Sequence, residues 1–257
     1  MVELSRGEVL HESNAGARLA PASLTKIMTA LVALEEGNPG EIVTVSRNAT
    51  RATGHRLRLH RGDRFVESDL MAAMLITSAN DACRTLAEAI GGTEREFVDK
   101  MNRYAEVLGL HDTHFQNACG FDAPGHYSTA RDLATLAAAA MQHNEFSFAV
   151  QQAGGVLRTV DGHRAYRLHT TNHLIDQYDG TIGVKTGFTR GAGRCLIARV
   201  VRDEGDVLLV MLNARHRWGD ATMLLSRAFD QLAKEQNTLV DDSPAPLETS
   251  PSPQLPL

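Results

Sequence analysis

The sequence predicts an α+β fold, in which an antiparallel sheet is flanked by N- and C-terminal helices and a mainly helical lobe is inserted between the two parts of the chain that form the sheet. Three observations predict it. Strand patterns open the chain, helical patterns follow one another from Ser23 to Met141, and strands separated by turns return from Gly155 onward. Both ends of the chain are therefore expected to contribute to one sheet.

The N-terminal region contains a predicted hairpin and the first predicted helix. Val2–Ser5 and Glu8–Glu12 flank a short turn at Arg6. Residues Ser23–Glu36 carry an apolar stripe at helical spacing, and Gly37 is the expected terminator of this helix.

The middle of the chain predicts a helical lobe. A polar, arginine-rich stretch, Ser46–Arg64, precedes a helix over Asp69–Ile76, for which Ser68 is the expected N-cap. Three more predicted helices complete the lobe, the first of them ending at a pair of glycines. They span Asn80–Ile90, Thr93–Leu108 and Thr129–Met141.

From Gly155 the pattern changes to strands. Val156–Val160 and His163–Leu168 flank an Asp-Gly pair, which is a strong hairpin signal. Three further strands, joined by short turns, predict an antiparallel meander, and Trp218–Glu235 predicts a closing helix. The strands of the meander are Thr181–Phe188, Arg194–Val201 and Val207–Asn213.

These elements predict one folded domain over residues 1–239. Its sheet lobe comprises about residues 1–45 and 155–239, and its helical lobe about residues 46–154. Residues 240–257 are rich in Pro and Ser without an apolar period, which predicts a disordered tail.

Composition argues against several classes of partner. The net charge is -5 at pH 7, so neither nucleic acid nor an anionic membrane is an expected partner. No apolar run is long enough to form a transmembrane segment, and residues 1–6 lack the apolar stretch of a secretory signal. The three cysteines, Cys83, Cys119 and Cys195, are expected to be mostly buried thiols, with a disulfide between two of them left open.

Positive charge is carried mainly by arginine, with twenty-two Arg and only four Lys. Lysine can lose its proton in a protein, whereas arginine cannot, so the positions of the lysines are informative. Lys26 and Lys185 both fall in short motifs that also contain Ser or Thr.

Ser23 and Lys26 form the first motif, at the start of a predicted helix. A spacing of three puts both side chains on one face, one turn apart, so that the amine can reach the hydroxyl. The helix N-terminus supplies positive potential beside the serine, and a partly desolvated lysine near other cations can act as a base. Alone, the pair is better explained as an N-cap serine and a surface lysine.

Two further motifs are weak individually. Ser78 and Asn80 lie in the short connection between two predicted helices, where both are good capping residues. Lys185-Thr186-Gly187 ends a predicted strand and is also explained as an edge strand entering a turn. Its glycine would let a substrate backbone lie close to the strand.

Together, S-x-x-K, S-x-N and K-T-G in this order are the signature of the penicillin-recognising serine enzymes. The chain resembles one of their families in particular, the serine D-Ala-D-Ala carboxypeptidases, which are low-molecular-mass penicillin-binding proteins of the S11 type. The resemblance covers roughly Val2–Leu232 and implies the fold of the penicillin-recognising transpeptidases and β-lactamases. It rests on Pro21–Ala30, Ser78–Ala82, Gly183–Thr189, and the stretch from Met101-Asn102 through His126–Asp132.

The resemblance implies catalytic roles for the first two motifs. Ser23 would attack the carbonyl between two D-alanines, and Lys26 would take its proton. Ser78 would relay that proton toward the leaving amine. Asn80 would orient Lys26 and bind the substrate's amide.

The resemblance also implies a binding site for the terminal carboxylate. Lys185 and Thr186, with Gly187 beside them, would bind the carboxylate of the substrate or of a β-lactam. The backbone N–H groups of Phe188 and of the nucleophile would form the oxyanion hole. Arg217 matches an arginine that the family often places near that carboxylate.

Three alternatives compete with this interpretation. A class A β-lactamase shares the motifs but needs a glutamate in E-x-x-L-N, and no such run occurs between Asn80 and Lys185. A non-catalytic penicillin-sensing or peptidoglycan-binding module is less favoured because all three motifs are intact. A metal peptidase is suggested only by His111 and His114, which lack a third ligand at a plausible spacing.

The implied reaction needs no metal or other cofactor. Its partners would be the D-Ala-D-Ala end of a peptidoglycan pentapeptide and β-lactam antibiotics. Without a visible signal, the residues alone leave open a cytosolic protein or one whose signal was removed. Because peptidoglycan peptides are processed outside the cytoplasmic membrane, the resemblance implies a periplasmic or otherwise external location.

Overall fold

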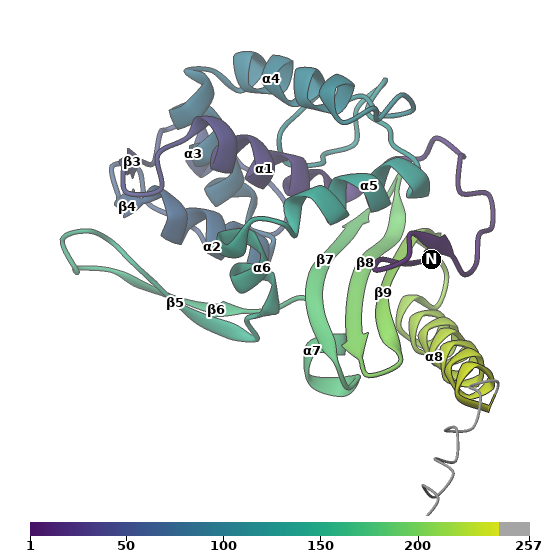
Figure 1. Cartoon of the computed structure of the whole chain (residues 1–257). Helices are drawn as coiled ribbons and strands as arrows, with labels where there is room; N and C mark the ends of the chain where they lie inside the picture. The colour runs from purple at the N-terminus through teal and green to yellow at the C-terminus, as the bar shows by residue number, and fades with distance from the viewer. Residues whose placement is uncertain (242–257) are drawn as a thin grey trace, which may run out of the picture.

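The computed structural model describes residues 1–241, and a five-stranded antiparallel sheet lies at its centre (Figure 1). The strand order is β2-β1-β9-β8-β7. Val2 pairs with Leu208 and Glu3 with Val207, so the first residues of the chain lie beside its last strand. The predicted α+β fold, with a sheet built from both ends of the chain, is confirmed. The strands are β1 (Val2–Glu3), β2 (Glu8–Val9), β7 (Thr181–Thr189), β8 (Gly193–Arg202) and β9 (Gly205–Ala214).

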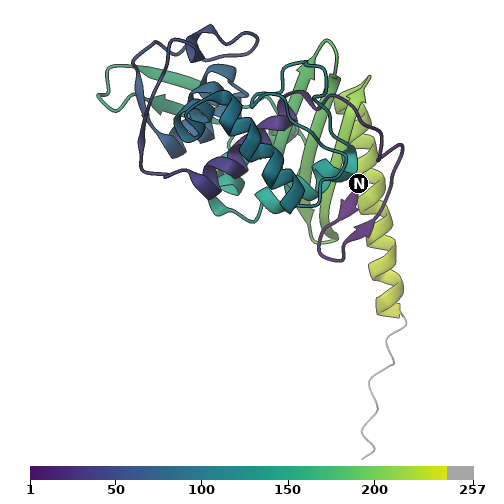
Figure 2. The same cartoon turned by 90° about the horizontal axis from the view of Figure 1, so that it is seen from above.

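Alternating side chains give the sheet two apolar faces, as the period of two along a strand requires. On β8, Leu196, Ala198 and Val200 belong to a cluster with apolar residues of the closing helix α8 (Arg217–Asp241). Their neighbour Ile197 belongs instead to the core of the helical lobe. The sheet is therefore sandwiched between α8 and the helical lobe (Figures 1 and 2).

The closing helix is longer than predicted at both ends. It begins at Arg217 and continues to Asp241, so residues 240 and 241, which the sequence assigned to a tail, are helical. The rest of that predicted tail, residues 242–257, lies outside the described residues. Among the helices of residues 1–241, none combines the length and the apolar composition needed to cross a membrane.

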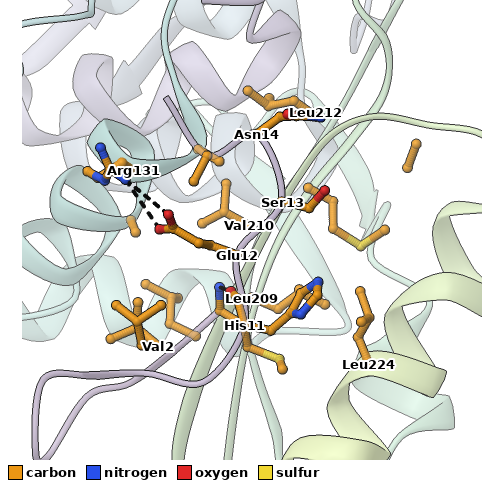
Figure 3. Close-up of a pocket in the computed structure, with 18 of the residues that line it drawn as sticks. Val2, His11, Glu12, Ser13, Asn14, Arg131, Leu209, Val210, Leu212 and Leu224 are labelled. Atoms are coloured by element: carbon orange, nitrogen blue, oxygen red, sulfur yellow. Dashed lines mark hydrogen bonds and ion pairs between the residues drawn. The ribbon is translucent and has the colours of Figure 1, made fainter. Parts of the chain in front are cut away.

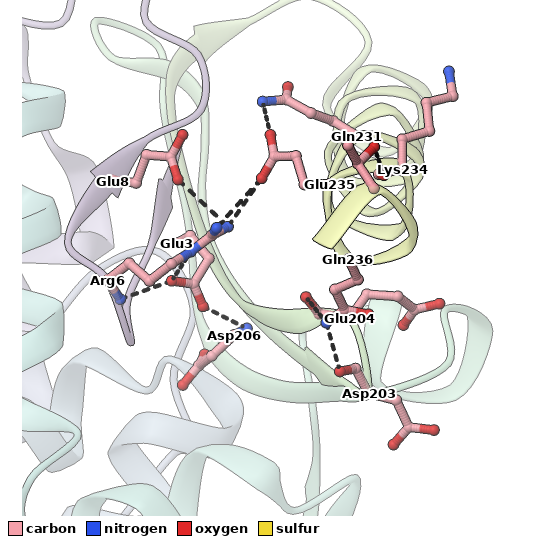
Figure 4. Close-up of polar contacts among 11 residues, drawn as sticks. Glu3, Arg6, Glu8, Asp203, Glu204, Asp206, Gln231, Lys234, Glu235 and Gln236 are labelled. Carbon is pink, nitrogen blue, oxygen red and sulfur yellow. Dashed lines mark hydrogen bonds and ion pairs between the residues drawn. The ribbon is translucent and has the colours of Figure 1, made fainter. Parts of the chain in front are cut away.

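Polar contacts connect α8 to two neighbouring turns at one end of the central sheet (Figure 4). Arg6, in the N-terminal hairpin, donates to Glu235 Oε2 at 3.3 Å. Gln236 Nε2 donates to the backbone oxygens of Asp203 and Glu204 at 3.3 and 3.2 Å. Exposed pairs of this kind add little to stability, so the apolar cluster beneath α8 supplies most of what holds the helix in place.

The helical lobe is built around α1 (Lys26–Glu36). Every residue of α1 from Lys26 to Ala33 is buried, which is the pattern of a helix surrounded by other elements. Helices α2 to α5 contact α1, and α6 packs against α2 and β7. These helices are α2 (Glu67–Thr77), α3 (Asn80–Gly91), α4 (Glu94–Val107), α5 (Ala130–Ala140) and α6 (Asn144–Gln151).

The start of α2 corrects the prediction that Ser68 is its N-cap. The helix begins at Glu67, directly after an extended residue, Val66, and has no side-chain cap. The backbone N–H groups of Glu67 and Ser68 donate to the carbonyl oxygens of Glu41 and Pro39, at 2.9 and 3.2 Å. Because tertiary contacts satisfy these first N–H groups, no capping side chain is required.

The hairpin predicted around the Asp-Gly pair is present, but it forms a sheet of its own. Its strands, β5 (Gly154–Arg158) and β6 (Ala165–His169), pair only with each other and pack on α2. Arg164 and Tyr166 donate to the carboxylate of Asp63 at 2.6 and 2.7 Å. The hairpin thus contacts the helical lobe, although its residues were grouped with the sheet lobe from the sequence. A second small sheet pairs β3 (Ile42–Thr44) with β4 (Arg64–Val66), and a short helix, α7 (Leu174–Gln177), precedes β7.

Candidate active site

Ser23 lies in a short 3-10 helix, η1 (Ala22–Thr25), directly before α1. The helix predicted from Ser23 is therefore 3-10 at its start and becomes α-helical at Lys26. Side chains three residues apart are eclipsed in a 3-10 helix, which brings the first motif together. Lys26 Nζ lies 3.1 Å from Ser23 Oγ.

Close packing fixes the position of η1. A Cβ on Gly187 of β7 would come within 3.1 Å of Ala22 Cβ and 3.2 Å of the Ser23 backbone nitrogen. A Cβ on Gly120 would overlap the carbonyl oxygen of Ala22, and Gly120 has a φ of +85° that favours glycine. The missing Cβ of Gly187 thus faces the segment that carries Ser23, rather than open space for a substrate.

His126 supports η1 from the helical lobe. Its Nδ1 accepts a hydrogen bond from the Gln116 backbone N–H at 2.9 Å, so Nε2 carries the proton and donates to Thr25 Oγ1 at 2.9 Å. Burial lowers the pKa of His126 to about 4, with a smaller contribution from His114. The imidazole is therefore neutral at neutral pH and serves as a buried hydrogen-bonding support.

Lys26 is fully buried and donates to three oxygens. Besides Ser23 Oγ, they are Asn80 Oδ1 at 2.7 Å and the backbone oxygen of Cys119 at 2.6 Å. Burial lowers the pKa of Lys26 well below its usual value, and the charge of Lys185 lowers it further. A lysine that gives up its proton readily can accept the proton of a neighbouring hydroxyl, so this pair can generate a nucleophile.

The second motif lies where α2 meets α3. Asn80, the first residue of α3, contacts Lys26 through Oδ1 and donates from Nδ2 to the Thr53 backbone oxygen at 2.7 Å. Ser78 adopts the left-handed conformation, with a φ of +62°, and is buried. No hydrogen bond of the Ser78 hydroxyl is found among residues 1–241, so the structure joins Asn80 directly to Lys26 but does not join Ser78 to it.

The third motif lies on β7, at the edge of the central sheet. Lys185 is buried, and its Nζ donates to the Thr186 backbone oxygen at 3.1 Å. Burial, together with a smaller contribution from the charge of Arg217, lowers the pKa of Lys185 to about 7. Thr186 Oγ1 lies 2.6 Å from Thr171 Oγ1. The next side chain, Phe188, is 61% exposed.

Arg217 is the first residue of α8 and contacts the backbone of the third motif. Its Nη1 donates to the backbone oxygens of Gly187 and Cys195, at 3.0 and 3.1 Å, and its guanidinium lies over the Trp218 ring. Its Nε is buried without a hydrogen-bond partner among the described residues. Arg217 therefore holds the carbonyl of the K-T-G glycine and adds positive charge beside Lys185.

Three contacts of the site were missed in the sequence. The backbone oxygen of Cys119 accepts from Lys26, that of Thr53 accepts from Asn80 Nδ2, and that of His55 accepts from the Asn80 N–H at 2.8 Å. All three acceptors are backbone carbonyls. Because every residue has one, no sequence signal could have identified them.

The open question of the cysteines is answered by a Cys83–Cys119 disulfide. Cys195 has a free, buried thiol. The expectation of three buried thiols is therefore wrong for two of them, although all three residues are buried as predicted.

The histidines behind the metal alternative make other contacts. His114 Nδ1 lies 2.9 Å from the Gly125 backbone oxygen, to which it donates. Within residues 1–241 there is no group of three or more His, Cys, Asp or Glu residues arranged to hold a metal ion.

A separate cavity of about 700 Å³ lies away from the three motifs (Figure 3). It is bounded by the segment around Glu12, by α5, by β9 and by α8, and the Glu12–Arg131 ion pair lies at its side. None of the motif residues lines it. The site chemistry is therefore concentrated between η1, α3 and β7, and not in this cavity.

Comparisons with known proteins agree with this geometry. The family profile described as D-alanyl-D-alanine carboxypeptidase, peptidase S11, matches residues 1–216. D-alanyl-D-alanine carboxypeptidase DacF of Bacillus subtilis is 36% identical over 239 residues, which cover 90% of this chain and 61% of DacF. DacC of Escherichia coli is 35% identical over 245 residues, which cover 89% of this chain and 60% of DacC. The chain thus spans about 60% of the length of these relatives.

Solved structures give the same result. The crystal structure of the Streptomyces K15 DD-transpeptidase superposes with a TM-score of 0.83 at 30% sequence identity, covering 89% of this chain and 95% of that one. The match in sequence and in fold extends over most of the described residues. The chain belongs to the peptidase S11 family of D-alanyl-D-alanine carboxypeptidases.

Proposed function

We propose that this protein is a serine-type D-alanyl-D-alanine carboxypeptidase, which trims peptidoglycan stem peptides through an acyl-enzyme on Ser23 and is covalently inhibited by β-lactams. One observation carries the proposal: Lys26 Nζ lies 3.1 Å from Ser23 Oγ in a site where burial and a second lysine lower its pKa.

Acylation follows from this pair. Ser23 Oγ attacks the carbonyl carbon of the penultimate D-alanine while its proton passes to neutral Lys26 Nζ. The negative charge then develops on the carbonyl oxygen, where the backbone N–H groups of Ser23 and Phe188 would donate. The C–N bond breaks as the leaving amine takes the proton, for which Ser78 would be the relay from Lys26 once substrate is bound, and D-alanine departs. An ester on Ser23 remains.

Deacylation reverses these roles. A water molecule takes the place of the departed D-alanine, loses its proton to the same base and attacks the ester carbonyl. The C–O bond breaks, Ser23 Oγ recovers its proton, and the shortened peptide leaves with a new carboxylate. Neither half of the cycle requires a cofactor.

The carboxylate of the terminal D-alanine would bind beside β7. Lys185 and Arg217 supply positive charge there, and Thr186 supplies a hydroxyl. A carboxylate next to Lys185 would favour its charged form and so raise its pKa again. Selectivity for a free C-terminus, and for the carboxylate of a β-lactam, follows from this charge. We also propose that the peptide bound at this site is a stem peptide of peptidoglycan.

An external location is also proposed. The substrate lies outside the cytoplasmic membrane, and the Cys83–Cys119 disulfide is of a kind that persists in oxidising compartments.

Release of D-alanine from a synthetic peptide ending in D-Ala-D-Ala tests the proposal. We expect turnover by the protein, a loss of more than about a thousandfold in Ser23→Ala, and unchanged turnover in Ser13→Ala, which replaces an exposed serine elsewhere. Absence of D-alanine release by the unmodified chain would contradict the proposal.

The lifetime of the penicilloyl-enzyme separates this function from a β-lactamase. No E-x-x-L-N run lies between Asn80 and Lys185, so we expect slow hydrolysis of the adduct and no sustained consumption of penicillin. Rapid, repeated penicillin hydrolysis would favour the β-lactamase alternative.

A further inference from the structure

The amine of Lys26 is held by oxygens from two separate parts of the chain. Asn80 Oδ1 belongs to the first turn of α3, whereas the Cys119 backbone oxygen belongs to the connection between α4 and α5. Their distances to Nζ are 2.7 and 2.6 Å. The direction in which Nζ faces Ser23 Oγ therefore depends on how α3 and residue 119 are placed relative to each other.

A covalent bond joins these two parts of the chain. Cys83 lies three residues after Asn80, about one turn further along α3, and its sulfur is bonded to that of Cys119. Both cysteines are buried, and Cys119 Sγ lies 3.7 Å from the Asn80 backbone oxygen. Residue 119, whose carbonyl accepts from Lys26, is thus bonded covalently to the turn of α3 that follows Asn80, the second residue that accepts from Lys26.

Three hydrogen bonds to one side chain hold the segment around Cys119 together. Asn117 Oδ1 accepts from the backbone N–H groups of Cys119, Gly120 and Phe121, at 3.2, 2.7 and 2.9 Å. Gly120 in turn lies against the carbonyl of Ala22, next to the nucleophile. A shift of residue 119 would therefore change both the contact with Lys26 and the support beneath η1.

We propose that the Cys83–Cys119 disulfide is a positioning device for catalysis: it fixes the two oxygens that aim Lys26 at Ser23. This inference rests on the proposed acyl-transfer function. With the bond reduced, the two sulfurs separate, the Cys119 carbonyl is no longer tied to α3, and Lys26 is less often aligned with Ser23 Oγ. Lys185 and Thr186, which would bind the carboxylate, make their side-chain hydrogen bonds to Thr171 and to the Thr186 backbone oxygen, and none to Cys83 or Cys119 among the described residues.

The proposal predicts a specific split in the kinetics. Reduction should lower the rate constant for acylation of Ser23 by benzylpenicillin about tenfold. The dissociation constant of the complex that precedes acylation should stay within about twofold, because Lys185 and Thr186 are unaffected. A disulfide with a purely structural role would change neither quantity at a temperature well below unfolding.

The experiment uses a Cys195→Ala background, so that the two bridging cysteines are the only ones. Dithiothreitol reduces the disulfide to two thiols by supplying two electrons and two protons, and is itself oxidised to its cyclic disulfide. Alkylation of the denatured protein should then label two thiols in the reduced form. Stopped-flow acylation and thermal unfolding are compared between the oxidised and reduced forms. The Cys83→Ala/Cys119→Ala variant is the matched control, since its acylation should be as slow as that of the reduced form and should not respond to dithiothreitol.

The outcomes are distinct. A reduced form that is folded and acylates within threefold of the oxidised form overturns the proposal, as does a loss that appears in the dissociation constant instead. If the double alanine variant does not fold, the reduced form still decides, because it retains both sulfurs. If the oxidised form is not acylated on Ser23 at all, the proposed function fails before this inference is reached.

Discussion

Two buried lysines in one site are the residue-scale feature on which the chemistry depends. Burial lowers the pKa of Lys26 well below its usual value and the pKa of Lys185 to about 7. The neutral oxygens around Lys26 do not offset these effects with an opposite charge. The proposed role of Lys26 explains why lysine, and not the far commoner arginine, occupies this position, since arginine does not deprotonate in proteins.

Replacement of Lys26 by arginine tests its role as a base. Lys26→Arg keeps the positive charge but cannot accept a proton, so we expect a folded protein whose acylation by penicillin is more than about a hundredfold slower. The matched control is Lys100→Arg, at a lysine that pairs with Glu36 on the helical lobe, and it should acylate normally. If Lys26→Arg acylated within about tenfold of the unmodified chain, a barrier difference of only ~1.4 kcal/mol, Lys26 would act electrostatically and not as the base.

At the scale of elements, the site depends on close contact between η1 and β7. These two elements are more than 150 residues apart in the sequence, and they touch at Gly187. The 3-10 geometry of η1 aligns Ser23 with Lys26, while β7 carries Lys185 along the same side. A small displacement of one element against the other would therefore separate Ser23 from Lys185 and Thr186.

Substitution of Gly187 tests this contact. Gly187→Ala places a Cβ 3.1 Å from Ala22 Cβ, so β7 and η1 must move apart by a few tenths of an ångström. We expect D-alanine release to fall at least tenfold, with a loss of stability of about 1–3 kcal/mol, the usual cost of overpacking. Gly155→Ala on β5, whose Cβ would make an ordinary contact at 3.8 Å, should change neither quantity. Normal turnover in Gly187→Ala would show that the contact is not needed.

At this scale, the sequence predicts the features that depend on local residue patterns and misses those that depend on tertiary contacts. The order of strands and the central helices follow from apolar periodicity, which is a local property. The 3-10 start at Ser23 and the uncapped start of α2 depend on tertiary contacts, namely Gly187 against Ala22 and the carbonyls of Pro39 and Glu41. Helix α6 was missed for a related reason, because its eight residues are too short to show a clear period.

The same distinction between side-chain patterns and tertiary contacts applies to the residues of the site. Ser23, Lys26 and Asn80 were found because their side chains carry a recognisable spacing, and the structure joins them by hydrogen bonds. The carbonyl of Cys119, the third partner of Lys26, could not be found, because a backbone acceptor leaves no mark in the sequence.

For the whole molecule, the site lies where the helical lobe meets the central sheet. Its residues come from η1, α1, α3 and β7, so both lobes must be folded for the site to exist. Burying lysines at this junction lowers the free energy of unfolding by an amount that depends on pH. Below its folded pKa of about 7, Lys185 is charged and poorly solvated; above it, the residue is neutral in the folded protein but still charged in the unfolded chain up to about 10.5.

The unfolding free energy should therefore rise with pH between about 7 and 10.5, because the unfolded chain binds more protons in that window. From pH 7 to 9 the contribution of Lys185 is about 2 kcal/mol. We expect urea unfolding to show this rise, and Lys185→Met to lose that part of it. Lys234→Met, at an exposed lysine of α8, should retain the full rise. A pH dependence unchanged by Lys185→Met would mean that Lys185 is not the group responsible.

The central claim is that Ser23 is the residue that becomes acylated, and intact-mass measurement after mixing with benzylpenicillin tests it most directly. We expect one adduct of the mass of the intact antibiotic, located by peptide mapping on the segment that contains Ser23, and no adduct on Ser23→Ala. An adduct on Ser78 or on Cys195, or labelling that persists in Ser23→Ala, would contradict the claim.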